Sequence, residues 1–335
     1  MLNILCRLRK AGAIVGWILS GITCFAATIA LKHLIETPQP LESALPGEAR
    51  LYRWHSYHVF YKVLGAAENP PMVLLHNPGI GASAYEMRQI MAKLAERYLV
   101  YAPDLLGFGL SDRPNIDYTV ETYTGLCHDF LTEVVQVAQH PATLLASGIS
   151  CTFAVEVATR FPATCERLIL ISPTALSGGR QVSRTFSSLL RLPGFGLCLY
   201  TLCSTRSALH WLLAQRNPQH QARQASQRGQ QGQREQTYVE YLYAATHRFG
   251  AEHALLSLWS GKLSLNASQQ FALLQQPALL IWGAQALHDF RSISDEYQQY
   301  HMPQQTQLAI MRDAGIYVHE QYPDVVITDI LDWSD

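Results

Sequence analysis

Residues 144–150 read Leu-Leu-Ala-Ser-Gly-Ile-Ser, and the expected fold rests on this stretch. An apolar strand pattern is followed at once by small residues and then by a helical pattern over 151–160. A strand, a sharp turn and a helix joined in this way frame the G-x-S-x-G motif, whose central serine is a nucleophile. The five positions here are Ala146-Ser147-Gly148-Ile149-Ser150, so the sequence keeps the turn and places Gly148 at its centre.

On either side of this turn, short apolar segments alternate with helical patterns. Strands that alternate with helices form a mainly parallel sheet with helices on both faces. The expected fold class is therefore α/β, a mostly parallel doubly wound sheet. Strands are predicted over 71–76, 98–102, 141–146, 167–172, 277–282 and 306–311, with a hairpin or two short strands over 51–64.

Two segments interrupt or modify this alternation. Ser83 and Glu86 have capping-box spacing, which predicts one helix from there to Arg97. Between about 173 and 271 the strands stop and only helical patterns are found. Within this part, the Gln/Arg-rich tract 215–236 has few apolar residues and is interpreted as a mobile loop. Helices are predicted over 186–192, 197–213, 238–248, 252–258, 291–300 and 324–333.

Composition limits the possible partners and cofactors. The 335 residues are 48% hydrophobic and 15% charged, with a formal net charge of −1. This balance permits a sizeable core and argues against nucleic acid as a partner. The seven cysteines form no C-x-x-C pair, and the 13 histidines show no metal-ligand spacing. We therefore expect no metal and no cofactor.

The N-terminal segment is predicted to meet a membrane. Residues 11–31 contain no charged side chain, and a run of this length can cross a bilayer as a helix. A cleaved secretory signal is the alternative, because Arg7, Arg9 and Lys10 precede the run. We favour a retained single-pass anchor over 1–35 and a Pro-rich tether over 36–49. The basic start weakly favours a domain outside the cytoplasm.

Several further motifs lie in a fixed order along the chain. They are His76-Asn-Pro-Gly79, Pro103-Asp-Leu-Leu-Gly-Phe-Gly-Leu-Ser111, the turn at Gly148, Ile281-Trp-Gly283 and the segment Asp313–Pro323. In this order the chain resembles the α/β-hydrolase fold family, specifically its cap-containing group. The resemblance implies a core over 50–175 and 272–335, and a helical cap over 176–271.

The resemblance also implies where a catalytic triad would stand. The nucleophile position matches Gly148, the acid position matches Ala286, and the base position matches Ile316. None of these side chains can attack, transfer a proton or orient an imidazole. The oxyanion loop and pocket positions match His76, Asn77 and Ile149. The expected triad is therefore degenerate at all three positions.

Neighbouring residues offer a fallback set. Ser147 is a candidate displaced nucleophile, with His319 and Asp289 as candidate base and acid. Ser150, at the start of the following helix, is interpreted as an N-terminal capping hydroxyl.

Two hypotheses follow. In the first, a membrane-anchored α/β-hydrolase-like protein lacks serine-hydrolase activity and binds an apolar small molecule, a lipid or a membrane-protein partner. In the second, the chain is an active esterase or lipase-like hydrolase that uses the displaced residues. A small-residue face at Gly12, Gly16 and Ser20 suits close packing against a membrane partner.

Overall fold

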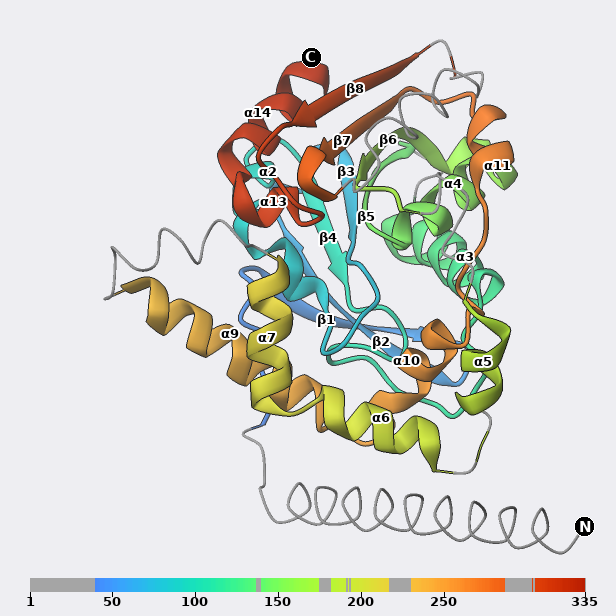
Figure 1. Cartoon of the computed structure of the whole chain (residues 1–335). Coiled ribbons are helices and arrows are strands. Elements are labelled where there is room, and N and C mark those ends of the chain that lie inside the picture. The colour runs from blue at the N-terminus through green and yellow to red at the C-terminus, as the bar shows by residue number, and fades with distance from the viewer. Residues whose placement is uncertain are drawn as a thin grey trace, which may run out of the picture.

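The computed structural model describes residues 40–136, 140–174, 182–190, 192, 194–216, 230–286, 303 and 305–334. Within this part of the chain, eight strands form one sheet in the order β1-β2-β4-β3-β5-β6-β7-β8 (Figure 1). The pairs β1–β2 and β2–β4 are antiparallel and the other pairs are parallel, which confirms the mostly parallel sheet. The strands are β1 Glu48–Trp54, β2 Tyr57–Leu64, β3 Pro71–Leu75, β4 Leu99–Pro103, β5 Ala142–Ser147, β6 Cys165–Ile171, β7 Ala278–Gly283 and β8 Thr306–Met311.

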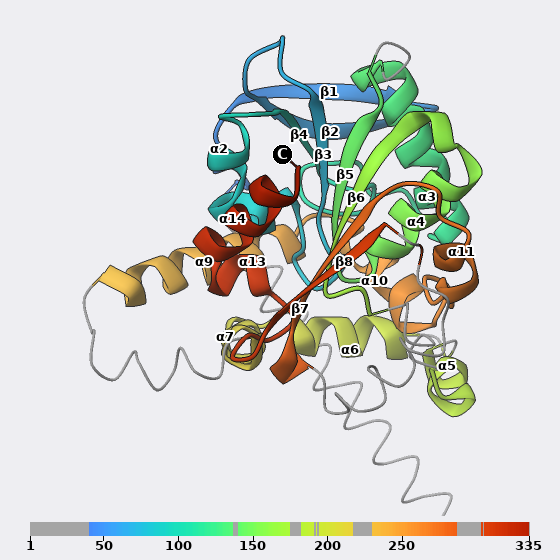
Figure 2. The ribbon, with the colours of Figure 1, turned by 90° about the horizontal axis from the view of Figure 1, so that it is seen from above.

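The central strands are apolar on both faces because helices cover both. Successive side chains of a strand point to opposite faces, so Leu144 and Leu145 of β5 enter two different cores. Figure 2 shows α3 and α4 on one side of the sheet and α2 and α14 on the other. The first face is covered by α3 Val120–Asp129, η2 Phe130–Val135, α4 Ser150–Arg160 and α11 Ser268–Ala272; the second by η1 Ala84–Gln89, α2 Met91–Leu94, α13 Val318–Gln321 and α14 Pro323–Ser334.

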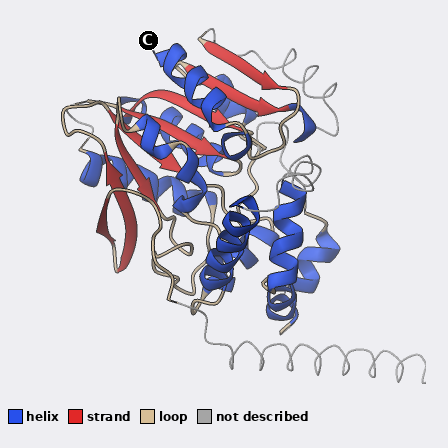
Figure 3. Cartoon of the chain, turned by 90° about the vertical axis from the view of Figure 1, so that its left-hand side faces the viewer, coloured by secondary structure: helices blue, strands red, loops and turns tan. Residues whose placement is uncertain are grey.

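The helices between β6 and α11 form a separate group, here called the cap. Figure 3 shows helices gathered at one end of the molecule, apart from the strands. The cap consists of α5 Arg184–Leu190, α6 Phe195–Cys203, α7 Arg206–Arg216, α9 Gln230–Thr246 and α10 Ala251–Trp259. Short turns of 3-10 helix, η3 Pro162–Thr164 and η4 Ala284–Ala286, follow α4 and β7.

The predicted capping box at Ser83 is wrong in its second half. Ser83 accepts a hydrogen bond from the Tyr85 N–H at 3.2 Å and caps η1, but Glu86 accepts one from the Asn77 N–H at 3.0 Å. The single helix predicted up to Arg97 is instead the short pair η1 and α2. The reason is tertiary: the carboxylate that would complete the box is used in contacts with another segment.

The element boundaries differ from the sequence prediction in three further places. The helix predicted over 197–213 is split into α6 and α7, because Thr205 accepts a hydrogen bond from the Ala208 N–H at 3.2 Å and starts a new helix. The helix α9 begins at Gln230, inside the tract interpreted as a loop. Strand β1 begins at Glu48, inside the predicted tether.

Two predicted segments lie outside the described residues: the anchor over 11–31 and the helix over 291–300. Among the residues that the structure does describe, none belongs to a helix with the length and apolarity needed to cross a bilayer.

Candidate functional site

The turn at Gly148 has the predicted geometry. Strand β5 ends at Ser147, Gly148 has φ +57°, and α4 begins at Ser150. The Gly148 N–H donates to the Ile171 carbonyl at 2.9 Å, which holds the turn against β6. Glycine adopts this left-handed conformation without the steric cost that a side chain brings. The turn therefore has the strand–turn–helix backbone of the G-x-S-x-G motif, with glycine at its centre.

Asn77 occupies the space in which a nucleophile would stand. A Cβ atom added to Gly148 would overlap Asn77 Oδ1 and lie 2.5 Å from its Cγ. Asn77 Oδ1 accepts a hydrogen bond from the Ile149 N–H at 3.0 Å. In the G-x-S-x-G arrangement, the N–H after the nucleophile stabilises the oxyanion. One carboxamide thus fills the space over Gly148 and accepts the Ile149 N–H.

The other end of this carboxamide is also fixed. Asn77 Nδ2 donates to the Tyr317 hydroxyl at 3.3 Å, and the Asn77 N–H donates to Glu86. Tyr317 follows Ile316, so the predicted base position adjoins the residue that holds Asn77. The sequence placed Asn77 in the oxyanion loop but gave no indication that its side chain would turn into the elbow.

The loops after β7 and β8 meet at the predicted acid and base positions. Gln285 donates its N–H to the Ala314 carbonyl at 2.9 Å, and Gly283 lies against the backbone of Gly315. Ala286 ends η4. Ile316 is 37% exposed. These loops therefore meet where a triad would be built, and neither predicted position carries a group that can transfer a proton.

A buried carboxylate lies beside the turn. Glu86 Oε1 is 3.2 Å from His319 Nε2, and both side chains are buried. Burial alone would raise the pKa of Glu86, but the adjacent imidazole of His319, with smaller contributions from His76 and Ser147, holds that pKa below its usual value. Glu86 is therefore a carboxylate inside the protein, and the sequence reasoning missed it because it assigned Glu86 to a helix cap.

The fallback set is not assembled in the predicted way. Ser147 is buried and contributes to lowering the pKa of Glu86, while His319 Nε2 is 3.2 Å from Glu86 Oε1. Asp289 lies outside the described residues. The carboxylate stands between the serine and the histidine, whereas a hydrolase needs the imidazole between them.

His76 and Ser150 both hold the loop that follows β3 in place. His76 Nε2 accepts a hydrogen bond from the Leu105 N–H at 3.0 Å, and burial lowers the pKa of His76. The imidazole is therefore neutral. Ser150 donates to the His76 carbonyl at 2.6 Å. The N-cap of α4 is Ile149, so the interpretation of Ser150 as the capping residue is wrong.

Aromatic and charged groups join the cap to η1 and α13. The Ser83 hydroxyl and the Tyr241 hydroxyl are 2.9 Å apart, and Tyr241 stacks on Tyr85. Arg88 donates to Glu320 at 2.7 Å, and its guanidinium lies over the ring of Tyr238. The helix α9 is thereby fixed to the two elements that carry Glu86 and His319.

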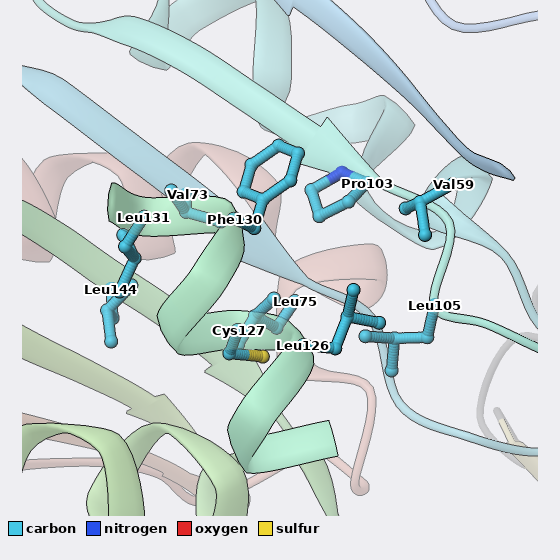
Figure 4. Close-up of a pocket in the computed structure, with 10 residues that line it drawn as sticks. All are labelled: Val59, Val73, Leu75, Pro103, Leu105, Leu126, Cys127, Phe130, Leu131 and Leu144. Carbon is cyan, nitrogen blue, oxygen red and sulfur yellow. The ribbon is translucent and has the colours of Figure 1, made fainter. Parts of the chain in front are cut away.

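A small cavity lies in the core on the face of the sheet that α3 and α4 cover, whereas Glu86 and His319 belong to η1 and α13 on the second face. Figure 4 shows its lining, in which Cys127 and Phe130 of α3 and η2 face Leu144 of β5. The volume open to the centre of a water molecule is about 10 Å³. A volume of about this size can hold one water. An apolar space of this size stays dry, so we interpret it as a packing gap in the core.

The chain is similar to known proteins in sequence and in fold. The sequence profile of the family described as "Alpha/beta hydrolase family" matches residues 72–329. An uncharacterised protein of Mycobacterium tuberculosis is 33% identical over 134 residues, which span 40% of this chain and 37% of that protein. The 2-hydroxy-6-oxo-6-(2'-aminophenyl)hexa-2,4-dienoic acid hydrolase of Metapseudomonas resinovorans is 38% identical over 71 residues, 21% of this chain and 24% of that enzyme. The matches thus span well under half of these relatives.

Solved structures share the fold at low identity. A structure described as a membrane phospholipase A, a bacterial virulence factor, has a TM-score of 0.65 at 20% identity, covering 100% of this chain and 98% of that one. A meta-cleavage product hydrolase has a TM-score of 0.63 at 18% identity, covering 86% of this chain and 97% of that one. At these identities the likeness concerns the fold alone.

Proposed function

Since the chain belongs to the alpha/beta hydrolase family, we propose that it keeps the fold of that family without its serine-hydrolase reaction. The observation that carries the proposal is the position of Asn77, whose carboxamide fills the space over Gly148 and accepts the Ile149 N–H. Serine hydrolysis needs a nucleophile at that point and a free donor for the oxyanion. Asn77 leaves no room for the nucleophile and occupies the donor.

We further propose that the domain acts at a membrane and binds there. Residues 11–31 carry no charge and are long enough to cross a bilayer, which supports a single-pass anchor. The bound molecule is an apolar small molecule, a lipid or a membrane-protein partner.

The proposal is tested with a fluorophosphonate probe and p-nitrophenyl esters on the full chain in mild detergent. We expect neither labelling nor turnover above a denatured sample. Labelling that disappears in Ser147→Ala would contradict the proposal.

A reconstruction tests the stated cause. The variant Asn77→Gly/Gly148→Ser/Ala286→Asp/Ile316→His removes the blocking carboxamide and restores the three side chains. We expect fluorophosphonate labelling of the introduced nucleophile in this variant alone. The matched control keeps Asn77 with the other three changes and is expected to remain unlabelled, because the carboxamide still occupies the Ile149 N–H. Labelling of that control would show that Asn77 does not block the site.

One observation favours the second hypothesis, an active hydrolase with displaced residues. Ser147, Glu86 and His319 form a buried polar group beside the elbow. In this case a Glu86→Gln variant would lose turnover together with Ser147→Ala. The order serine, carboxylate, histidine and the burial of Ser147 make this the weaker of the two proposals.

A further inference from the structure

Two arginines meet at one carbonyl between the core and the cap. Arg113 lies in the loop after β4, and Arg248 lies in the turn between α9 and α10. Both guanidinium groups donate to the carbonyl of Gly109, and the bond from Arg248 measures 3.1 Å. Two positive charges that share one neutral acceptor repel each other, and burial reduces the screening of this repulsion by water. The fold thus holds two like charges together at this point.

The acidic side chains near this arginine pair have other partners. Among the described residues, neither Arg113 nor Arg248 forms an ion pair with a carboxylate. Asp104 accepts hydrogen bonds from two backbone N–H groups, both at 2.7 Å. Glu252 Oε1 lies 3.5 Å from His253 Nε2. The positive charge of the pair is therefore not neutralised by direct contact with an acidic residue of the described chain.

The guanidinium of Arg113 also has a donor to spare. Its Nε is shielded from solvent and has no hydrogen-bond partner among the described residues. Burial, and after it the charge of Arg248, lowers the pKa of Arg113 to about 10, so the guanidinium is still charged at neutral pH. A buried donor without an acceptor costs stability, and a charged donor costs more. A negatively charged acceptor would satisfy both the donor and the charge.

A cavity lies beside Arg113, between loops of the core and the cap helices α6, α9 and α10. Among the described residues that line it, Arg113 alone is charged, and most of the others are glycine, alanine or larger apolar residues. The cavity has room for one water-sized group. The cavity of Figure 4 has similar room but an apolar lining. A cavity that holds a charged donor binds an oxygen atom, whereas an apolar one stays dry.

The first turn of α10 lies against the same cavity. Ala251, with which α10 begins, belongs to the lining. The turn before it is close to the arginine loop, because a Cβ atom added to Gly250 would lie 2.6 Å from the Arg113 carbonyl oxygen. The N-terminal end of a helix carries a partial positive charge. The packing of the cap on the core therefore adds positive potential beside Arg113.

We propose that Arg113 binds an oxygen atom of a small oxyanion, a carboxylate or phosphate group, in this cavity. Arg113 supplies the charged N–H donors, and Arg248 and the start of α10 add positive charge from nearby. A guanidinium recognises both groups because each presents a negative oxygen to its planar array of N–H donors. The inference goes beyond the closed turn at Gly148, since anion binding requires neither a nucleophile nor its absence. Its failure would leave the fluorophosphonate experiment unaffected.

The test is isothermal titration calorimetry of the full chain in a non-ionic detergent at pH 7. Sodium chloride keeps the ionic strength constant, so that general salt effects cancel. The probes are inorganic phosphate, acetate and dihexanoyl phosphatidic acid below its micelle concentration. We expect saturable binding of inorganic phosphate at one site. Competition by acetate would show that a carboxylate is also accepted, and competition by the phosphatidic acid would show that a lipid headgroup reaches the same site. A native chain that binds none of the three would overturn the proposal.

Matched variants locate the site. Arg113→Gln is expected to weaken phosphate binding at least about tenfold, because it removes a charged hydrogen-bond donor. Arg248→Gln removes only a neighbouring charge, and we expect binding to weaken about threefold or more. The control Arg160→Gln removes the same charge from a side chain that is 43% exposed and paired with Glu121, and it should bind as the native chain does.

Circular dichroism establishes which variants are folded before they are titrated. Native affinity in folded Arg113→Gln would overturn the proposal. If Arg113→Gln does not fold, Arg248→Gln decides, and native affinity in that variant would overturn it. Equal weakening in Arg160→Gln and Arg248→Gln would assign the effect to net charge and would also overturn it.

Discussion

At the scale of single residues, Asn77 connects the turn at Gly148 to two other segments. Its carboxamide contacts Gly148, accepts from Ile149 and donates to Tyr317. Three segments that are far apart in the sequence are joined through one side chain. A glycine at the centre of the turn is what makes this possible, because any side chain at that position would meet the carboxamide.

The substitution Gly148→Ser tests this packing. The new Cβ would overlap Asn77 Oδ1, in a left-handed backbone that serine adopts poorly. We expect the free energy of unfolding to fall by about 2–4 kcal/mol. Thermal unfolding measures the change. The control Gly79→Ser has nothing within 4 Å of its new Cβ and should have little effect.

Pairing Gly148→Ser with Asn77→Gly removes the overlap, so the two changes together should lower the free energy of unfolding by less than the sum of their separate effects. Neither variant should gain esterase activity, because Ala286 and Ile316 supply no acid or base. Turnover in either variant would reveal a base that these positions do not account for.

The buried imidazole of His76 predicts how stability depends on pH. Burial lowers the pKa of His76, so the unfolded chain binds a proton near pH 6.5 that the folded chain does not bind. The stabilisation is present above pH 6.5 and is lost as the pH falls below it, by at most about 1.4 kcal/mol per pH unit. Thermal unfolding of the native chain and of His76→Gln, followed from pH 7 to pH 5, measures this. A native chain that is equally stable across this range, or the same pH dependence in both proteins, would contradict the assignment.

At the scale of elements, η1 and α13 form a unit that the cap closes. Glu86 and Arg88 of η1 contact His319 and Glu320 of α13. The helix α9 adds its tyrosines to the same place. Side chains that the sequence suggested for helix capping and for catalysis are used here to hold elements together.

A double-mutant cycle measures this connection. Arg88 and Glu320 are 20% and 12% exposed, so removing either partner leaves a poorly solvated charge. We expect a coupling energy of about 1–3 kcal/mol from Arg88→Ala and Glu320→Ala. The control pair Arg160 and Glu121 has a similar distance, 2.8 Å, but is 43% and 74% exposed. Its coupling should not exceed about 1 kcal/mol. Equal coupling in the two cycles would show that burial is not the cause.

At the scale of the whole molecule, charge is distributed unevenly. The net charge of −1 hides a stretch from Arg167 to Arg234 with nine arginines and no acidic residue. A chain in which one sign of charge is grouped in this way interacts with opposite charge more strongly than its net charge suggests.

This asymmetry predicts chromatographic behaviour. In mild detergent at pH 7, the full chain should bind a cation exchanger despite its negative net charge. Arg223→Gln/Arg228→Gln should elute at lower salt. The control Arg53→Gln/Lys93→Gln removes the same charge outside this segment and should elute close to the native chain. A native chain that passes through the column unbound would contradict the prediction.

The amino-acid sequence alone was enough to predict the sheet and the turn at Gly148. Apolar strands between helical patterns leave few alternatives to a parallel sheet, and Gly148 marks a backbone conformation that it adopts freely. The prediction of a capping box at Ser83 and Glu86 was wrong, although the spacing of the two residues matches that motif. These side chains contact Tyr241 and His319, which lie far away in the sequence. A prediction from local sequence does not include such contacts.

The side chain that fills the space over Gly148 depends on tertiary packing. The sequence of the loop at His76 and Asn77 says nothing about the direction of the Asn77 side chain. That direction depends on the Ile149 N–H, the Tyr317 hydroxyl and the space over Gly148, which come together only when β3, β5 and α13 are packed. The sequence shows that position 148 has no side chain. The packing of the folded chain decides which group fills the space over Gly148.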